Sequence, residues 1–191
     1  MNNNKIIIVE GYLAAGKSTF VKQMSKALNI PNFIKDTFKI ALSANFPVSC
    51  KEDSNRFSAI TFDAIMYVAE RFMEAGHPLI IEGNFVPAGM KKVDEASVIR
   101  ELIEKYSYQS LTFKFVGDSH VLYKRYSDRN NLPERGDANK DYIEVTFDMY
   151  DGYCRSLEAF NVGGQVIKVD TTDFEKIDFN YYIEKARLFL E

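Results

Sequence analysis

Residues 5–24 read KIIIVEGYLAAGKSTFVKQM, and this stretch decides the fold. Its first part, Ile6 to Val9, is a continuous apolar run, as expected of a parallel strand that is buried on both faces. The next residues, GYLAAGKS, fit the spacing G-x-x-x-x-G-K-[ST] of a phosphate-binding loop. After the loop, apolar residues recur at helical spacing from Phe20 to Leu28. The stretch therefore predicts a strand, a phosphate-binding loop and the start of a helix.

The loop carries the residue types that phosphate binding needs. Its backbone N–H groups form a cradle for anions, and the positive end of the helix dipole adds to the attraction. We expect Lys17 to reach the β- and γ-phosphates of a nucleotide and the Ser18 hydroxyl to ligate Mg²⁺. A chance match in an ordinary glycine-containing turn is the alternative, and the position between a strand and a helix argues against it. The loop residues expected to bind nucleotide are Gly11, Ala14, Ala15, Gly16, Lys17, Ser18 and Thr19.

Length and composition indicate an ordinary globular chain. Of its 191 residues, 46% are hydrophobic and 27% are charged, so we expect one domain over residues 1–191 with a full core. A net charge of −3 argues against a general nucleic-acid or membrane-surface binder, which usually has a basic face. Cys50 and Cys154 fit no metal-binding spacing and are expected to be reduced thiols. Because no secretory leader and no apolar stretch of membrane-spanning length stand out, we expect a cytoplasmic protein, monomeric or homodimeric.

Strand and helix patterns alternate along the rest of the chain. Short apolar or alternating runs predict further strands at residues 33–35, 79–81, 111–115 and 166–169. Helical spacing of apolar residues predicts helices within 57–72, 99–106, 143–157 and 179–186. This alternation predicts an α/β fold in which a parallel sheet has helices on both faces. In such sheets ligands bind beyond the carboxyl ends of the strands.

Carboxylates stand at the predicted strand ends. Asp36 follows the second strand, Glu82 the third, and Asp118 and Asp170 follow the last two. Such acids suit magnesium and proton chemistry where a cation and a phosphoryl group meet. Acids in these positions also commonly cap the helices that follow strands. We favour the cap for Asp118 and Asp170, and it remains an alternative for Asp36.

Glu82 comes directly after the apolar run at 79–81. This position indicates the acid of a second nucleotide-binding motif, which would hold Mg²⁺ through water, because Mg²⁺ keeps much of its hydration. The alternative is that Glu82 contacts the phosphoryl acceptor, and the neighbouring Asn84 favours that alternative.

A basic cluster occurs late in the chain and consists of Lys124, Arg125, Arg129 and Arg135. The first three share a helical face, and the fourth lies in the turn-rich stretch NNLPERG. Cations over the transferred charge and a flap that expels water both favour phosphoryl transfer. We therefore predict a mobile lid over about residues 127–141, with Arg125, Arg129 and Arg135 contacting nucleotide. A solvated charged helix is the alternative.

Taken in order, these motifs resemble those of the P-loop small-molecule kinases, the group that includes gluconate and shikimate kinases, chloramphenicol phosphotransferase and zeta toxins. The sequence is also similar to AAA-type ATP-binding proteins described only as kinase-like. The resemblance covers nearly the whole chain. It rests on GYLAAGKST, KDTF, LIIEGNF, and YKRYSDRNNLPERG followed by VDTT.

The resemblance implies a P-loop NTPase fold with a five-stranded sheet in the order 2-3-1-4-5 and a small lid. It implies transfer of the γ-phosphoryl group of ATP, with Mg²⁺, to a hydroxyl of a small-molecule acceptor. Arg125 and Arg129 match lid-side arginines of the family, and Asp36 matches the acid that in several members takes the proton of the acceptor hydroxyl. The resemblance thus makes Lys17, Asp36, Arg125 and Arg129 the expected catalytic residues, with Ser18 and Glu82 as metal ligands.

Other nucleotide-binding classes fit less well. No Asp-x-x-Gly tetrapeptide of a GTPase occurs, and the loop lacks the Gly-x-Gly-x-x-Gly of dinucleotide-binding proteins. The segment IIEGNF has Asn84 where nucleoside monophosphate kinases have phenylalanine, and no arginine follows Pro87, so a nucleotide acceptor is disfavoured. Two alternatives stay open: a regulatory or toxin-associated P-loop ATPase with little turnover, and a nucleoside or nucleotide kinase.

The identity of the acceptor does not follow from the sequence. His77 and His120 are expected to be structural, and Tyr142, Tyr150 and Tyr153 are expected to pack the late helix against the sheet. Aromatic residues at helical spacing are more often core than pocket, so no single residue is assigned to the acceptor. The segments expected to flank its site contain Phe38, Phe46, Arg56, Phe57, Phe62, Asp63 and Phe85.

Overall fold

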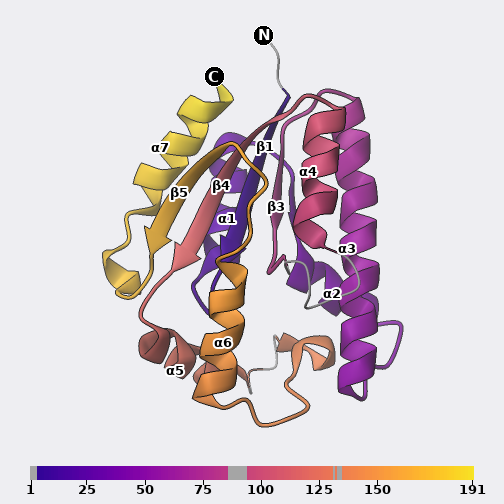
Figure 1. Cartoon of the computed structure of the whole chain (residues 1–191), viewed down its shortest axis with the longest axis vertical. Coiled ribbons are helices and arrows are strands. Elements are labelled where there is room, and N and C mark those ends of the chain that lie inside the picture. The colour runs from indigo at the N-terminus through magenta and orange to yellow at the C-terminus, as the bar shows by residue number, and fades with distance from the viewer. Residues whose placement is uncertain (1–3, 86–93, 131, 133–134) are drawn as a thin grey trace.

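A five-stranded parallel sheet forms the centre of the molecule (Figure 1). The computed structural model describes residues 4–85, 94–130, 132 and 135–191. The strand order is β2-β3-β1-β4-β5, so the predicted α/β fold and the order 2-3-1-4-5 are both confirmed. The strands are β1 (Lys5–Gly11), β2 (Asn32–Ile34), β3 (Leu79–Glu82), β4 (Gln109–Val116) and β5 (Gln165–Asp170).

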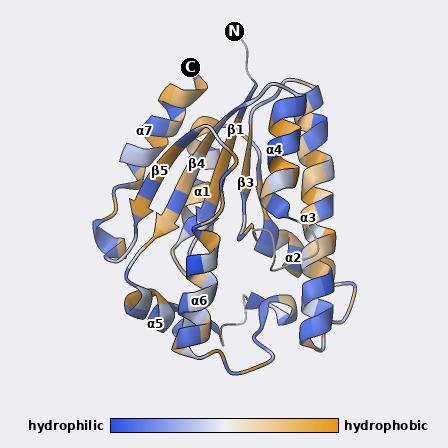
Figure 2. Cartoon of the chain, in the orientation of Figure 1, coloured by the Kyte–Doolittle hydropathy of each residue, from blue (hydrophilic) through white to orange (hydrophobic). Residues whose placement is uncertain are grey.

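Helices cover both faces of this sheet. They are α1 (Lys17–Leu28), α2 (Lys35–Ser43), α3 (Lys51–Glu74), α4 (Glu95–Lys105), α5 (Ser119–Asn130), α6 (Phe147–Leu157) and α7 (Phe179–Leu190), with 3₁₀ turns η2 (Asp137–Asn139) and η3 (Phe174–Lys176). One core cluster joins the sheet to α1, α5, α6 and α7, and a second joins it to α3 and α4. The strands are accordingly apolar while the helices carry polar outer faces (Figure 2).

The strand register brings the predicted functional residues to one edge of the sheet. Val9 of β1 pairs with Glu82 of β3, and Glu10 pairs with Lys114 of β4. Side chains alternate between the two faces of a sheet. Glu82 therefore lies on the α1 face, beside the phosphate-binding loop, and Glu10 lies on the opposite face.

Capping explains where the predicted element ends were right or wrong. α6 begins at Phe147 and not at 143, because the Thr146 hydroxyl accepts a hydrogen bond from the Met149 N–H at 3.3 Å and starts the helix there. Asp118 caps α5 as predicted, since it accepts from the N–H groups of residues 120 and 121 at 3.0 Å. The predicted helix cap at Asp170 is wrong: its carboxylate accepts from the Thr172 N–H in a turn, and Asp178 caps α7.

Asp36 lies in the first turn of α2 and makes no side-chain capping hydrogen bond. The alternative that it serves as an N-cap is therefore wrong. Its carboxylate is left available at the carboxyl edge of the sheet, where β2 ends.

Within the segment predicted as a lid, residues 137–139 lie against α2 and α3, and residues 131, 133 and 134 are outside the described residues. α5 runs to Asn130, and η2 follows after a short stretch. Ala138 of η2 is fully buried in a small core cluster with Val48 and Phe57.

None of the helices in the described residues is long and apolar enough to cross a membrane.

Candidate active site

The loop between β1 and α1 needs glycine at two positions. Gly11 has φ of 120°, and a Cβ atom there would lie 2.1 Å from the Phe115 carbonyl oxygen. Gly16 has φ of 83°, and a Cβ there would lie 2.2 Å from the Phe174 ring. Both glycines of the motif are therefore explained by a positive φ angle and by neighbouring atoms that leave no space for a Cβ.

Lys17 lies at the centre of this loop. Its Nζ donates hydrogen bonds to the carbonyl oxygens of Gly11 at 2.8 Å and Tyr12 at 2.7 Å. Burial lowers the pKa of the Lys17 ammonium, and the nearby carboxylate of Glu82 opposes that effect. A buried ammonium inside a ring of backbone groups is a suitable partner for the outer phosphates of a nucleotide.

Ser18 and Glu82 meet across the gap between α1 and β3. The Ser18 hydroxyl donates to Glu82 Oε2 at 2.8 Å. Burial raises the pKa of Glu82 to about 7, Lys17 opposes this, and Asp36 adds to it. The two side chains offer hard oxygen ligands, so they fit Mg²⁺, and this contact favours the metal role of Glu82 over the acceptor role. No group of three or more His, Cys, Asp or Glu that could hold a metal occurs in the described residues.

Asp36 faces this pair from the start of α2. Its charge acts on the ionisation of Lys17, Glu82 and Arg129, so all four groups lie within electrostatic reach of one another. Its backbone carbonyl accepts a hydrogen bond from Asn139 Nδ2 at 3.3 Å, which ties the residue to η2. The carboxylate is exposed, so an acceptor molecule can reach it.

Arg129 and Arg135 form a second positive centre beside the first. The guanidinium carbon of each lies 5.9 Å from the Tyr126 ring centre, and Arg135 Nη2 donates to the Asn139 carbonyl at 2.5 Å. Burial lowers the pKa of Arg129, and the neighbouring Arg135 lowers it further. Neither Nε has a hydrogen-bond partner in the described residues although both are buried. Two neighbouring like charges, each with a buried and unused Nε donor, indicate a binding site for an anion.

Comparison with solved structures identifies the architecture. No protein-family model matches the sequence, and the comparison with curated proteins finds no match. A protein from Chloroflexus aurantiacus, provisionally assigned as a kinase, has a TM-score of 0.82 at 24% identity, over 99% of this chain and 100% of that one. A shikimate kinase from Bacteroides thetaiotaomicron has a TM-score of 0.56 at 15% identity, over 97% of each chain. A gluconokinase from Sinorhizobium meliloti 1021 has a TM-score of 0.54 at 15% identity, over 100% of this chain and 93% of that one.

The fold is that of the P-loop small-molecule kinases. At these levels of sequence identity the comparison shows the fold alone. The chemistry has to be argued from the side chains of this protein. In this P-loop kinase fold, the carboxyl edge of the sheet carries Lys17, Ser18, Glu82 and Asp36. Arg129 lies within electrostatic reach of this group.

Arg125 does not join Arg129 in this P-loop kinase fold. Its guanidinium donates to the carbonyl oxygens of Thr171 at 2.6 Å and Thr172 at 2.8 Å, and it lies 5.8 Å from the Phe174 ring. It therefore anchors the loop after β5, on the side of the phosphate loop where Phe174 contacts Gly16. Lys124 is exposed. The predicted basic cluster thus divides, and Arg129 and Arg135 are the two that converge.

Tyr153 of α6 feels the charge of Asp36, which the sequence did not indicate. It was expected to pack against the sheet, and its phenol also lies within electrostatic reach of Asp36 and Glu95. Burial raises the pKa of the Tyr153 phenol, and the charges of Asp36 and Glu95 raise it further. The hydroxyl makes no hydrogen bond within the part of the chain that the structure describes. Tyr142 differs from expectation too: it precedes α6, and its hydroxyl lies 2.9 Å from the Val48 carbonyl.

A buried ion pair next to Asp36 also escaped prediction. Lys35 Nζ lies 2.7 Å from Glu95 Oε1, and both side chains are almost fully buried. The ammonium lies 5.3 Å from the Phe62 ring centre and 5.9 Å from that of Phe85. The pair joins the N-terminus of α2 to that of α4 and so fixes the backbone from which Asp36 projects.

α6 and the residue that follows it contact the phosphate loop through two tyrosine hydroxyls. The Tyr150 hydroxyl donates to the Leu13 carbonyl at 2.8 Å, and the Tyr12 hydroxyl bonds to Glu158 just after α6. Tyr150 is buried, as its predicted packing role requires. Five residues separate the predicted lid segment from α6, so the helix that next follows the lid in the chain is the one that contacts the phosphate loop.

The residues expected to flank the acceptor fall into two groups. Phe57, Phe62 and Phe85 are buried and belong to the core clusters, in line with the preference of aromatic residues for the core. The others, Phe38, Phe46, Arg56 and Asp63, are exposed. His120 stacks on Phe147 with ring centres 4.1 Å apart, which agrees with a structural role.

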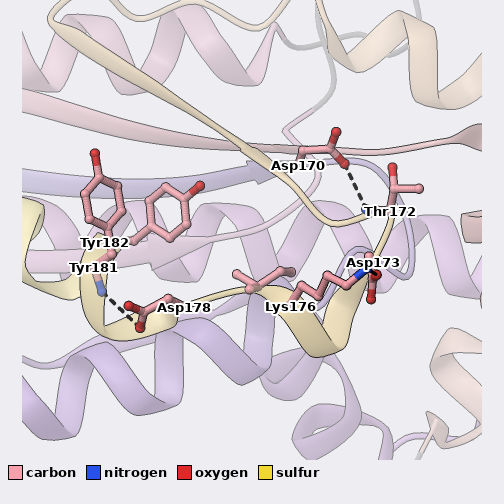
Figure 3. A pocket seen from close by; sticks show the side chains of 8 residues that line it. Asp170, Thr172, Asp173, Lys176, Asp178, Tyr181 and Tyr182 are labelled. Atoms are coloured by element: carbon pink, nitrogen blue, oxygen red, sulfur yellow. Dashed lines mark hydrogen bonds and ion pairs between the residues drawn. The ribbon is translucent and has the colours of Figure 1, made fainter.

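A surface hollow of about 430 Å³ lies beside the loop that Arg125 anchors (Figure 3). Its acidic residues all make local contacts: Asp170 accepts from Thr172, Asp178 from Tyr181, and Asp173 pairs with Lys176 (Figure 3). The hollow lies beyond β5 and contains none of the phosphate-loop residues. These contacts account for the acidic groups of the hollow, which is separate from the candidate site.

Proposed function

We propose that this protein transfers the γ-phosphoryl group of ATP to a hydroxyl of a small molecule. The observation that carries the proposal is the convergence of Lys17, Ser18, Glu82, Asp36 and Arg129 at one edge of the sheet. A phosphate cradle alone would suit any nucleotide-binding protein. An exposed carboxylate opposite the cradle adds a group that can accept the proton of an attacking hydroxyl, which favours a kinase.

Each of these residues has a part in the proposed reaction. Lys17 and the loop N–H groups bind the outer phosphates, and Arg129 and Arg135 bind charge on the transferred group. Ser18 and Glu82 would hold Mg²⁺, which neutralises phosphate charge when bound. Asp36 orients the acceptor hydroxyl by accepting its hydrogen bond and takes its proton as the O–P bond forms. Tyr153, which lies within electrostatic reach of Asp36, is proposed to contact the acceptor.

The acceptor is proposed to be a small molecule and the reaction cytoplasmic, in a monomer or a homodimer. The structural likeness to a gluconokinase and a shikimate kinase supports a small-molecule acceptor. Arg125 keeps its proposed role next to nucleotide, at the loop after β5, where it lies between the phosphate loop and residues 171 and 172.

A panel of hydroxyl-bearing metabolites, scored by ATP consumption with Mg²⁺, tests the proposal. We expect one or more members to raise ATP consumption above the rate with water alone. Lys17→Ala should abolish that increase and weaken binding of a non-hydrolysable ATP analogue while the fold survives, because the ammonium is a direct phosphate ligand. Equal binding and equal turnover in the two proteins would contradict the proposal. Tight ATP binding with no acceptor-dependent turnover would favour the regulatory ATPase instead.

A further inference from the structure

A buried hydrogen-bond relay holds η2 against the helices α2 and α3. Lys39 Nζ of α2 donates to Ser54 Oγ of α3 at 2.8 Å, and the Ser54 hydroxyl donates to the Ala138 carbonyl at 2.9 Å. Lys39, Ser54 and Ala138 are all buried. A hydroxyl suits this position because it accepts one hydrogen bond and donates another at the same time.

Further contacts hold the same segment in place. The Tyr142 hydroxyl lies 2.9 Å from the carbonyl oxygens of both Val48 and Asp137, and so bridges the segment to the α2–α3 connection. A Cβ atom at Gly136 would lie 3.4 Å from Ile40, so the backbone approaches α2 closely. Among the hydrogen bonds that the structure describes, the one from Ser54 to the Ala138 carbonyl is the buried bond that joins α3 to η2.

The relay leads directly to the arginine pair. Arg135 Nη2 donates to the carbonyl of Asn139, the residue after Ala138, at 2.5 Å. Arg135 in turn lies beside Arg129 at the Tyr126 ring. A shift of the Ala138 carbonyl away from Ser54 would move the backbone to which the Arg135 guanidinium is bonded.

We propose that Ser54 is a positioning residue that holds Arg135 where it binds the outer phosphates of ATP. The inference rests on the nucleotide site of the proposed function. The helices α2 and α3 would then have two functions: α2 carries Asp36, and α3 holds Arg135 in position through Ser54. Loss of the Ser54 hydroxyl leaves the Ala138 carbonyl without its buried donor, and the segment loses its fixed distance from α3.

A double-mutant cycle on nucleotide affinity tests this inference. The variants are Ser54→Ala, Arg135→Ala and the double variant, and the probe is a non-hydrolysable ATP analogue with Mg²⁺, with AMP as the reference ligand. We expect Ser54→Ala to weaken the analogue about tenfold, the size of one lost buried hydrogen bond, and to leave AMP affinity unchanged. The double variant should bind the analogue no more weakly than Arg135→Ala alone, because Ser54 acts through Arg135.

Ser43→Ala is the matched control, since the Ser43 hydroxyl donates only within α2, to the Ile40 carbonyl at 2.8 Å. Its affinities should equal those of the wild type. If Ser54→Ala fails to fold, Ser54→Cys, which keeps the size but bonds weakly, replaces it in the cycle.

Additive losses in the double variant, or an unchanged affinity in Ser54→Ala, would overturn the inference. Absence of any binding of the analogue by the wild type would overturn both the inference and the proposed function. If Ser54 and Arg135 are coupled in the affinity cycle but no acceptor yields a phosphorylated product, the proposed function alone would be overturned.

Discussion

Glu10 is a buried carboxylate whose removal should make the protein more stable at neutral and alkaline pH. The residue is fully buried, and Lys114 Nζ lies 3.4 Å from Glu10 Oε1. Neither carboxylate oxygen has a hydrogen-bond partner in the described residues. Burial raises the pKa of Glu10 from 4.5 to about 7, and Lys114 and Lys17 only partly oppose this. Desolvation therefore outweighs the ion pair.

The direction of the pH dependence follows from proton binding. Between pH 4.5 and about 7 the folded protein holds a proton on Glu10 that the unfolded chain releases. The stability associated with Glu10 is thus fully present below pH 4.5 and is lost as pH rises through 7. The difference between a pKa of 4.5 in the unfolded chain and about 7 in the folded protein corresponds to about 3 kcal/mol in the free energy of unfolding.

Urea unfolding of Glu10→Gln and wild type from pH 5 to pH 8, without nucleotide or Mg²⁺, measures this effect. The amide has the size of the carboxyl and no charge, and Lys114 keeps its hydrogen bonds to the Glu158 and Phe160 carbonyls at 3.0 Å. We expect similar stabilities at pH 5 and a variant that is more stable by up to about 3 kcal/mol at pH 8. Glu82 titrates in both proteins, so its contribution cancels in the difference. A wild type that gains stability over the variant as pH rises would refute the reasoning, because the ion pair would then outweigh desolvation.

Three further substitutions have defined outcomes. Gly11→Ala should lower the free energy of unfolding by about 3 kcal/mol, because φ is 120° and the new Cβ would lie 2.1 Å from the Phe115 carbonyl oxygen; Gly152→Ala in α6, where nothing lies within 4 Å, should instead raise it by up to about 1 kcal/mol. Chemical denaturation of both variants checks this, and equal losses would contradict the steric argument. Tyr153→Phe should raise KM for the acceptor about tenfold with KM for ATP unchanged, as measured by steady-state kinetics, whereas an unchanged acceptor KM would return Tyr153 to a packing role.

The phosphate loop and the sheet were predictable because each depends on local signals. Glycines at fixed spacing, a lysine and a hydroxyl between an apolar run and a helical pattern give the loop directly. Glu82 followed from its position after a short buried strand, and its contact with Ser18 agrees with that prediction.

The division of the basic cluster was not predictable, because it depends on tertiary partners. Arg125 and Arg129 are four residues apart on α5, so helical spacing assigns them to one face. The carbonyls of Thr171 and Thr172 hold one of them, while the other lies beside Arg135. The electrostatic link between Tyr153 and Asp36 was missed for the same reason, since aromatic spacing does not indicate which charges lie within reach of a phenol.

Glu10 had a signal that was not used. It ends an apolar run in a strand expected to be buried on both faces, where a charge is costly unless it is paired. Lys114 on β4 is the only basic residue within the alternating pattern 111–115, so the pair could have been inferred from strand neighbours.

Phosphorus NMR of the products formed by wild type and Asp36→Asn from ATP, Mg²⁺ and an active acceptor tests the central claim most directly. Asp148→Asn, an exposed acid in the first turn of α6, is the control and should match the wild type. We predict a phosphate monoester of the acceptor from the wild type, and a rate about 10²–10⁴ lower from Asp36→Asn, with ATP binding and thermal stability preserved. Undiminished transfer by Asp36→Asn, or inorganic phosphate as the only product of the wild type with every acceptor, would contradict the account.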